Sequence, residues 1–151
     1  RMIVLASEDI GNAEPYALTL ATSCFTAVDY IGMPEARIIL AQTATYLASA
    51  PKSNASYRAI EDALEVVRTQ SSGEVPLHLR NAPTKLMKEL KYGEEYKYSH
   101  SYEGHFVDQQ YLPDNLKEKI FYSPTEEGKE KEIKERLEKW WSSRINSKFK
   151  K

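Results

Sequence analysis

Residues 17–31 read ALTLATSCFTAVDYI, and this stretch decides the fold class. Its apolar residues recur at helical spacing rather than in the alternation that a strand would show. They form two neighbouring stripes, and so wide an apolar surface predicts burial on more than one side of the helix. The stripes are Leu18, Ala21, Phe25 and Val28, and next to them Leu20, Cys24, Ala27 and Ile31.

Glycine and proline mark further helices after this stretch. Gly32 ends the first helix and Pro34 begins the next, since glycine accepts a left-handed conformation and proline suits a first helical turn. Ser53 or Asn54 can cap another helix, which is predicted to extend to about Gln70. The predicted buried face of the first of these two helices is Ala36, Ile39, Leu40, Ala44, Leu47 and Ala48. In the second, helical spacing is shown by Tyr57, Ile60, Ala63, Leu64 and Val67.

Residues 1–9 are predicted to be the last part of a helix, which ends at Gly11. Because the chain starts inside this helix and without an initiator methionine, we expect it to be a piece of a longer protein. Thirteen of the fourteen alanines precede Leu64, and small side chains let helix axes approach closely. Residues 1–70 are therefore predicted to form an antiparallel, all-α bundle.

Residues 71–122 have a different character. Val75–Leu79 is predicted to be extended, and a short helix from about Thr84 to Lys91 is predicted to end at Gly93. Residues 94–113 carry aromatic side chains without helical spacing, which predicts a short hairpin or an ordered loop. In the short helix, the residues expected to face inward are Leu86, Met87 and Leu90.

Residues 123–151 are predicted to be a charged final helix with a basic tail. Ser123 and Glu126 have the spacing of a capping box with Pro124 at the first helical position, so the helix is expected to run from Pro124 to about Arg144 or beyond. Its predicted apolar stripe is Ile133, Leu137, Trp140 and Trp141.

The net charge is −1, so no strong field favours nucleic acid or a membrane. Residues 1–70 sum to −3 and residues 115–151 to +4. Cys24 is the single cysteine, which excludes an intrachain disulfide and fits a reducing cytoplasm; it is predicted to be a small core residue. No apolar run approaches the ~18 residues that span a bilayer.

Motifs of enzyme sites are missing from the sequence, which has no Walker A loop, His-Glu-x-x-His or Gly-x-Ser-x-Gly pattern. His100 and His105 lie near Glu103 and Asp108, but surface or packing roles are favoured over a metal site. A small hydrolase that uses His78 or His100 is the weakest of the functional alternatives. We therefore predict no catalytic residue, no metal and no cofactor-binding residue in this chain.

Basic and aromatic residues give the one chemical signal with some weight. Lysines and an arginine on one predicted face could contact phosphates, while nearby tyrosines could stack on bases. Alternatively, the lysines solvate a helix face and the tyrosines cover apolar surface. The candidate nucleic-acid-binding residues are Arg80, Lys85, Lys88 and Lys91, with Tyr92, Tyr96 and Tyr98 beside them.

Five segments in this order carry a family resemblance: Leu5–Pro15, Ile31–Arg37, Tyr46–Asn54, Val75–Gly93 and Gln109–Pro113. Together they resemble the C-terminal part of the bacterial replication-associated recombination protein A family. These are clamp-loader-like AAA+ ATPases related to the Werner-helicase-interacting protein. The resemblance extends from Arg1 to about Glu135.

The resemblance implies a single C-terminal domain over residues 1–151, similar to the helical collar of clamp loaders. In the replication-associated recombination protein A family this domain is associated with assembly into a homotetramer. The full-length protein would be a DNA-dependent ATPase acting in replication, recombination and repair at stalled forks. ATP and Mg²⁺ would bind in an N-terminal AAA+ module outside these residues. The implied partners are copies of the chain, DNA through the full-length protein, and single-strand-binding protein; no membrane is expected, and the location would be the cytoplasm at the nucleoid. More apolar surface than a lone bundle needs is offered by the doubly apolar helix of residues 17–31, the alanine-rich helix that follows it and the Trp140–Trp141 pair, which is compatible with self-association.

Overall fold

The computed structural model describes residues 1–70 and 73–142. These residues form six α-helices, joined by short π-helical and 3-10 turns, and contain no strand, which confirms the predicted all-α class. They divide into two compact units. Residues 1–63 with 121–139 form unit 1, and residues 64–70, 73–120 and 140–142 belong to unit 2.

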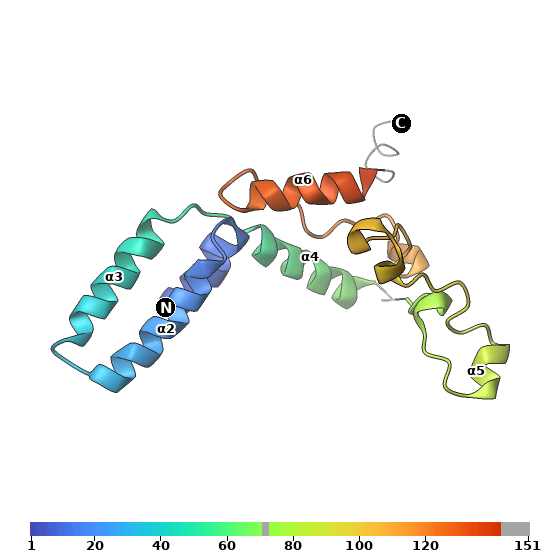
Figure 1. Cartoon of the computed structure of the whole chain (residues 1–151), viewed down its shortest axis with the longest axis horizontal. Coiled ribbons are helices and arrows are strands. Elements are labelled where there is room, and N and C mark those ends of the chain that lie inside the picture. The colour runs from blue at the N-terminus through green and yellow to red at the C-terminus, as the bar shows by residue number, and fades with distance from the viewer. Residues whose placement is uncertain (71–72, 143–151) are drawn as a thin grey trace. The chain divides into compact units, whose positions relative to one another are not determined.

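Unit 1 is built on an antiparallel helical hairpin. Helices α2 (Tyr16–Ile31) and α3 (Ala36–Ser49) lie side by side (Figure 1). Helix α1 (Met2–Leu5) continues through a π-helical turn, Ala6–Ile10, and packs against both. Small residues let these backbones approach closely. The core consists of Ala6, Ile10, Ala17, Ala21 and Leu47.

Gly11 ends the first helical segment, as predicted, and it does so with a φ of +52°. The Ser53 amide donates to the carbonyl of Ile10 at 3.3 Å, so the loop after α3 lies directly against this turn. A Cβ at Gly11 would lie 2.6 Å from the carbonyl oxygen of Ser53. Both the left-handed backbone and the close approach therefore require glycine here.

The buried faces of α2 and α3 are narrower than predicted. Cys24 is buried as expected, but Leu18 and Phe25 are 43% and 68% exposed, so burial of α2 on more than one side is wrong within this chain. In α3 the predicted Ala44 and Ala48 are exposed, while Thr43 is buried and its hydroxyl donates to the carbonyl of Ile39 at 3.0 Å. This internal hydrogen bond lets a polar residue occupy the core position.

Helix α4 (Ala55–Thr69) has the predicted position, and the hydroxyl of Ser53 accepts a hydrogen bond from the Ala55 amide at 3.2 Å. The predicted helical spacing is confirmed, but of the residues that define it only Ala63 is half-buried. Hydrophobic spacing shows which residues share a face, but not whether the same chain covers that face. The exposed members are Tyr57, Ile60, Leu64 and Val67, whereas Ala55 and Val66 are buried and Ala59 is half-buried.

Unit 2 contains one further short helix, α5 (Lys85–Glu89), which the Thr84 hydroxyl caps by accepting from the Met87 amide at 3.3 Å. Leu86 and Leu90 are 64% and 51% exposed, so the prediction that they face inward is wrong. The segment is too short to lie against a second element along its length. Single 3-10 turns occupy Leu77–Leu79, Ser99–Ser101, Glu103–His105 and Asp114–Leu116.

The aromatic-rich residues 94–113 form an ordered loop with 3-10 turns, one of the two predicted alternatives. Phe106 stacks on Trp140 with ring centroids 5.2 Å apart and meets Trp141 edge-on at 4.9 Å, while Tyr111 lies 6.2 Å from Trp141. The tryptophan pair therefore packs within unit 2, while Trp140 stays 36% exposed.

Helix α6 (Glu130–Trp140) begins six residues later than the capping-box pattern predicts. Residues before it form turns, in which Gly128 has a φ of +50° and the Lys129 amide donates to the carbonyl of Ala13 at 2.8 Å. This contact with a distant segment fixes the turn and delays the helix. The predicted end near Arg144 lies outside the described residues.

Candidate functional site

Arg80, the first residue of the predicted basic face, is engaged within unit 2. Its guanidinium forms a 2.6 Å ion pair with Glu74 and donates to the carbonyl of Val75 at 2.6 Å and to the hydroxyl of Tyr92 at 3.2 Å. It also lies over the Tyr92 ring, 5.1 Å from the centroid. These contacts hold residues 74, 75 and 92 close together, so Arg80 positions the segment between them, which carries the lysines.

The three lysines of the predicted face are exposed. Lys85 and Lys88 lie three residues apart in α5 and therefore share one side of that helix. Lys91 follows with a φ of +64°, and its ammonium lies 3.7 Å from the carboxylate of Glu94, an exposed pair of small energetic weight. The lysine part of the predicted face is thus present at the surface of unit 2.

Exposed aromatic rings follow the lysines along the same unit. Tyr96, Tyr98 and Tyr102 are 52%, 58% and 42% exposed. The rings of Tyr98 and His100 lie 5.2 Å apart, and those of His100 and His105 lie 4.9 Å apart. Exposed rings of this kind offer faces on which unpaired bases can stack.

The histidines considered for chemistry have packing partners. His78 Nε2 lies 2.8 Å from the carbonyl oxygen of Gln110 and ties the Leu77–Leu79 turn to the returning chain. The ring contacts of His100 are with Tyr98 and His105. Within residues 1–70 and 73–142, no three histidine, cysteine or acidic side chains are grouped so that they could hold a metal ion.

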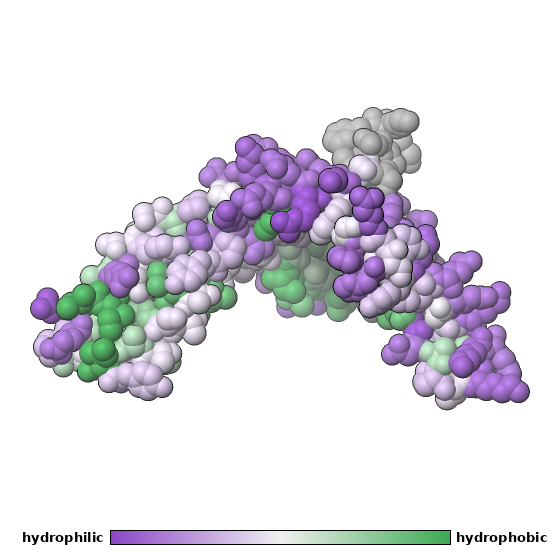
Figure 2. Space-filling model, viewed as in Figure 1, coloured by the Kyte–Doolittle hydropathy of each residue, from purple (hydrophilic) through white to green (hydrophobic). Residues whose placement is uncertain are grey.

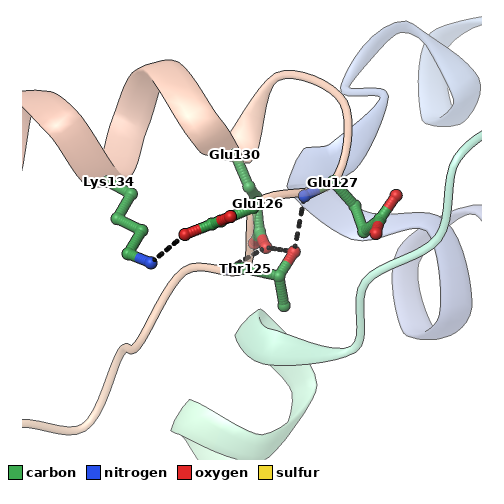
Figure 3. Close-up of polar contacts among 5 residues, drawn as sticks. All are labelled: Thr125, Glu126, Glu127, Glu130 and Lys134. Atoms are coloured by element: carbon green, nitrogen blue, oxygen red, sulfur yellow. Dashed lines mark hydrogen bonds and ion pairs between the residues drawn. The ribbon is translucent and has the colours of Figure 1, made fainter.

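A second polar site, which sequence reasoning missed, surrounds Glu130 at the start of α6 (Figure 3). This carboxylate is 0% exposed. Its Oε2 accepts from the Ser53 hydroxyl at 2.6 Å and from the amide and hydroxyl of Thr125, each at 2.8 Å. Its Oε1 accepts from the Tyr122 hydroxyl at 2.8 Å. The four donors are neutral, and they join α6 to the loop between α3 and α4.

The hydrogen-bond network extends from Glu130 to the N-terminal segment. The Tyr122 hydroxyl accepts from the Asn12 amide at 3.2 Å, and the same amide donates to the hydroxyl of Ser56 at 3.0 Å. Residues far apart in the sequence are thereby held together in unit 1; Ser53 and Glu130 alone are 77 positions apart. No local pattern separates Glu130 from the other acidic residues of this charged helix, which is why sequence reasoning missed it.

Two opposing effects set the ionisation of this buried carboxyl. Burial raises the pKa of Glu130, but the hydrogen bonds from Ser53, Thr125 and Tyr122 outweigh it, so the pKa lies below its ordinary value. Burial, with the bond to Glu130, raises the pKa of the Tyr122 phenol. Glu130 therefore stays ionised and Tyr122 neutral at physiological pH, which preserves the donor–acceptor pairing.

Exposed ion pairs flank the buried carboxylate. Lys134 lies 2.7 Å from Glu126, as Figure 3 shows, and Lys129 lies 2.9 Å from Glu132. The amide of Glu127 donates to the Thr125 hydroxyl at 3.2 Å, which holds the turn before α6. The ion pairs lie at the surface, so the buried network rather than these pairs anchors the helix.

Large apolar side chains are exposed on the helices of unit 1. Figure 2 shows hydrophobic surface at the end of the α2–α3 hairpin and over α4. Such surface usually marks an interaction site. At the hairpin the side chains are Phe25, Ile31, Met33 and Ile38, which are between 57% and 73% exposed.

Comparison with known proteins identifies the family of this helical chain. The model of the MgsA AAA+ ATPase C-terminal family matches residues 1–141. The chain belongs to this family. This confirms the resemblance seen in the sequence, and the MgsA C-terminal match covers both units. None of the described helices combines the length and the apolar character needed to cross a membrane.

Relatives of this MgsA-family chain include two replication-associated recombination proteins A. That of Coxiella burnetii is 46% identical over 139 residues, which cover 91% of this chain and 32% of the relative. That of Escherichia coli K12 is 43% identical over 138 residues, covering 91% and 31%. The ATPase WRNIP1 of Dictyostelium discoideum is 43% identical over 123 residues, covering 81% and 14%. The chain thus spans a third or less of the length of these relatives.

Proposed function

We propose that this chain is the oligomerisation domain of a DNA-dependent AAA+ ATPase, and that it assembles as a homotetramer. The full-length protein would act in DNA replication, recombination and repair at stalled forks. ATP and Mg²⁺ would be bound by a separate N-terminal module, so this domain would contribute assembly rather than catalysis. The family match and the names of the relatives support the ATPase and recombination context.

The exposed apolar surface of α2, α3 and α4 is the observation that carries the oligomerisation role. Phe25, Ile38 and Ile60 are 68%, 61% and 54% exposed and lie on three different helices. A soluble monomer rarely leaves so many large apolar side chains in water. Burying them against other copies would recover the favourable free energy of removing apolar surface from water.

The oligomerisation role is tested by the mass of the 151-residue chain in solution. Light scattering coupled to size exclusion, at micromolar concentration and without DNA, should give a mass four times that of one chain. A monomer under these conditions would overturn the proposal. Repeating the measurement with a single-stranded oligonucleotide shows whether assembly depends on DNA.

Direct DNA contact through unit 2 is a second candidate function. The observation that favours it is the exposure of Lys85, Lys88 and Lys91 together with the exposed tyrosine rings that follow them. Lysines would neutralise phosphates and the rings would stack on bases. Arg80 would act by positioning this segment, because its guanidinium is already bound within the unit.

Charge reversal tests the DNA contact. The double variant Lys85→Glu/Lys88→Glu should weaken binding of single-stranded or forked DNA and reduce the salt slope by about one per lost phosphate contact. Lys117→Glu/Lys119→Glu changes the charge equally at exposed positions away from α5 and serves as the control. Equal affinities for the two variants, or no salt-sensitive binding by the wild type, would refute direct contact.

The family resemblance also supports single-strand-binding protein as a partner and the cytoplasm, at the nucleoid, as the location. We propose both. Co-sedimentation of the chain with purified single-strand-binding protein tests the first, and a fluorescent fusion that overlaps the DNA stain tests the second. Independent sedimentation or a uniform fluorescent signal would contradict them.

A further inference from the structure

Three aromatic rings gather on the loop that follows α5 in unit 2. The His100 ring contacts that of Tyr98, with centroids 5.2 Å apart, and that of His105, with centroids 4.9 Å apart. The planes of these two pairs are inclined by 46° and 51°, so the rings cover one another only in part. All three side chains are exposed. We call Tyr98, His100 and His105 the ring cluster.

The backbone holds the ring cluster in place. The Ser101 amide donates to the carbonyl of Tyr98 at 2.9 Å, and the His105 amide donates to the carbonyl of Tyr102 at 3.0 Å. Gly104 and His105 have φ values of +67° and +55°, and two successive left-handed residues turn the chain sharply. This turn brings the last ring of the cluster back to the first two. Because the cluster is already formed, a ligand that binds it loses little free energy to ordering.

Tying the chain together does not account for the two histidines of the cluster. His78 has that role, since its Nε2 lies 2.8 Å from the carbonyl oxygen of Gln110. For His100 and His105 the contacts within residues 1–70 and 73–142 are ring contacts rather than hydrogen bonds. A Cβ at Gly104 would meet nothing within 4 Å, so there is open space beside His105. The rings are therefore accessible to a ligand.

Charge separates the ring cluster from α5. Residues 84–93 carry three lysines and one glutamate, which gives +2, whereas residues 94–105 carry one lysine and three glutamates, which gives −2 with histidine counted as neutral. Phosphates are therefore attracted to α5 and repelled from the loop. Duplex DNA presents its phosphates and keeps its base faces stacked, while a single strand exposes them. The loop thus suits unpaired bases.

We propose that the ring cluster is a stacking site for unpaired bases, so that unit 2 takes single-stranded rather than duplex DNA; this inference rests on the direct DNA contact proposed above. Tyrosine and histidine rings offer their faces to any base. The loss of one such stacking contact weakens binding by about tenfold or more. The exposed Lys85 and Lys88 of α5 contact the phosphates of the strand.

Strands that differ only in their bases test the site. By fluorescence anisotropy, the 151-residue chain should bind a labelled mixed-sequence single strand about tenfold or more tightly than an abasic strand of the same length, which has the same phosphates. Tyr98→Ala/His100→Ala should lose this preference and keep its affinity for the abasic strand. Tyr98→Phe/His100→Phe restores two rings and should recover the preference. Lys85→Glu/Lys88→Glu should weaken the binding of both strands alike.

A matched control removes an exposed ring from the other unit. Tyr30→Ala, at an 83% exposed position of α2, should bind both strands as the wild type does. Unlabelled duplex of the same sequence should compete less well than the single strand. Equal binding of normal and abasic strands by the wild type, an unchanged preference in Tyr98→Ala/His100→Ala, or equal competition by duplex would overturn the stacking site and leave the phosphate contact standing. A wild type that binds neither strand would overturn both.

Discussion

Glu130→Gln removes a negative charge from a buried carboxylate while almost preserving the shape of the side chain. Four neutral donors point at the carboxylate, three of them at Oε2. A glutamine carbonyl can take the place of Oε2, but its bonds lose charge assistance and its amide group meets the Tyr122 hydroxyl, which must rotate to accept. Hydrogen bonds to charged groups stabilise by about 1 kcal/mol more than neutral ones, so the loss over four bonds is about 4 kcal/mol.

Urea unfolding at pH 7, followed by circular dichroism at 222 nm, measures this loss as a lower transition midpoint. Glu132→Gln is the matched control, because Glu132 lies two residues further along α6 and pairs with Lys129 at the surface. An exposed pair contributes little, so the control should unfold close to the wild type. If Glu130→Gln unfolds at the same urea concentration as Glu132→Gln, the buried network does not anchor α6 and the reasoning fails.

The remaining predictions concern pH, the glycine before α6 and the arginine of unit 2. Folding lowers the pKa of Glu130, so the ionised carboxylate stabilises the folded chain fully above the pKa of the unfolded state, about 4.3. This stabilisation is lost as the pH falls through the pKa of the folded state. Acid titration should therefore destabilise the wild type more steeply than Glu130→Gln. Gly128→Ala should lower stability by about 1–3 kcal/mol in the same urea assay, since φ is +50° and the added Cβ would collide with the carbonyl of Ala13. A Cβ at Gly104 meets nothing within 4 Å, so the control Gly104→Ala should cost about 1 kcal/mol. Equal losses of stability in the two variants would contradict the close approach at Gly128. Arg80→Lys keeps the charge but loses the forked guanidinium that contacts Glu74 and Tyr92. Amide hydrogen exchange of residues 74–92 should therefore become faster, while the salt dependence of DNA binding stays unchanged. A weaker salt dependence would show that Arg80 contacts phosphate.

The candidate site was predictable in part. Lys85, Lys88 and Lys91 are exposed as their spacing predicts, because lysine ammonium groups remain in water unless a partner buries them. Arg80 looks the same as these lysines in the sequence, yet Glu74 and Tyr92 bind it. That contact depends on how the chain turns between residues 74 and 92, which no local pattern specifies.

The sequence by itself determined the all-α class and the positions of α2, α3 and α4. These follow from local causes: helical spacing of apolar residues, and the glycine and prolines that break the helices at Gly32, Pro34 and Pro51. Local dihedral preferences act on neighbouring residues, so they can be read from the residue types alone.

Only the tertiary structure decided which side of α4 is covered, where α6 begins and that Glu130 is buried. Each depends on residues distant in the sequence: the α6 turn is held by Ala13, and the Glu130 carboxylate by Ser53. Burial and hydrogen bonding are properties of what packs against a residue, so an apolar stripe can stay exposed and a glutamate in a charged helix can become a buried anchor.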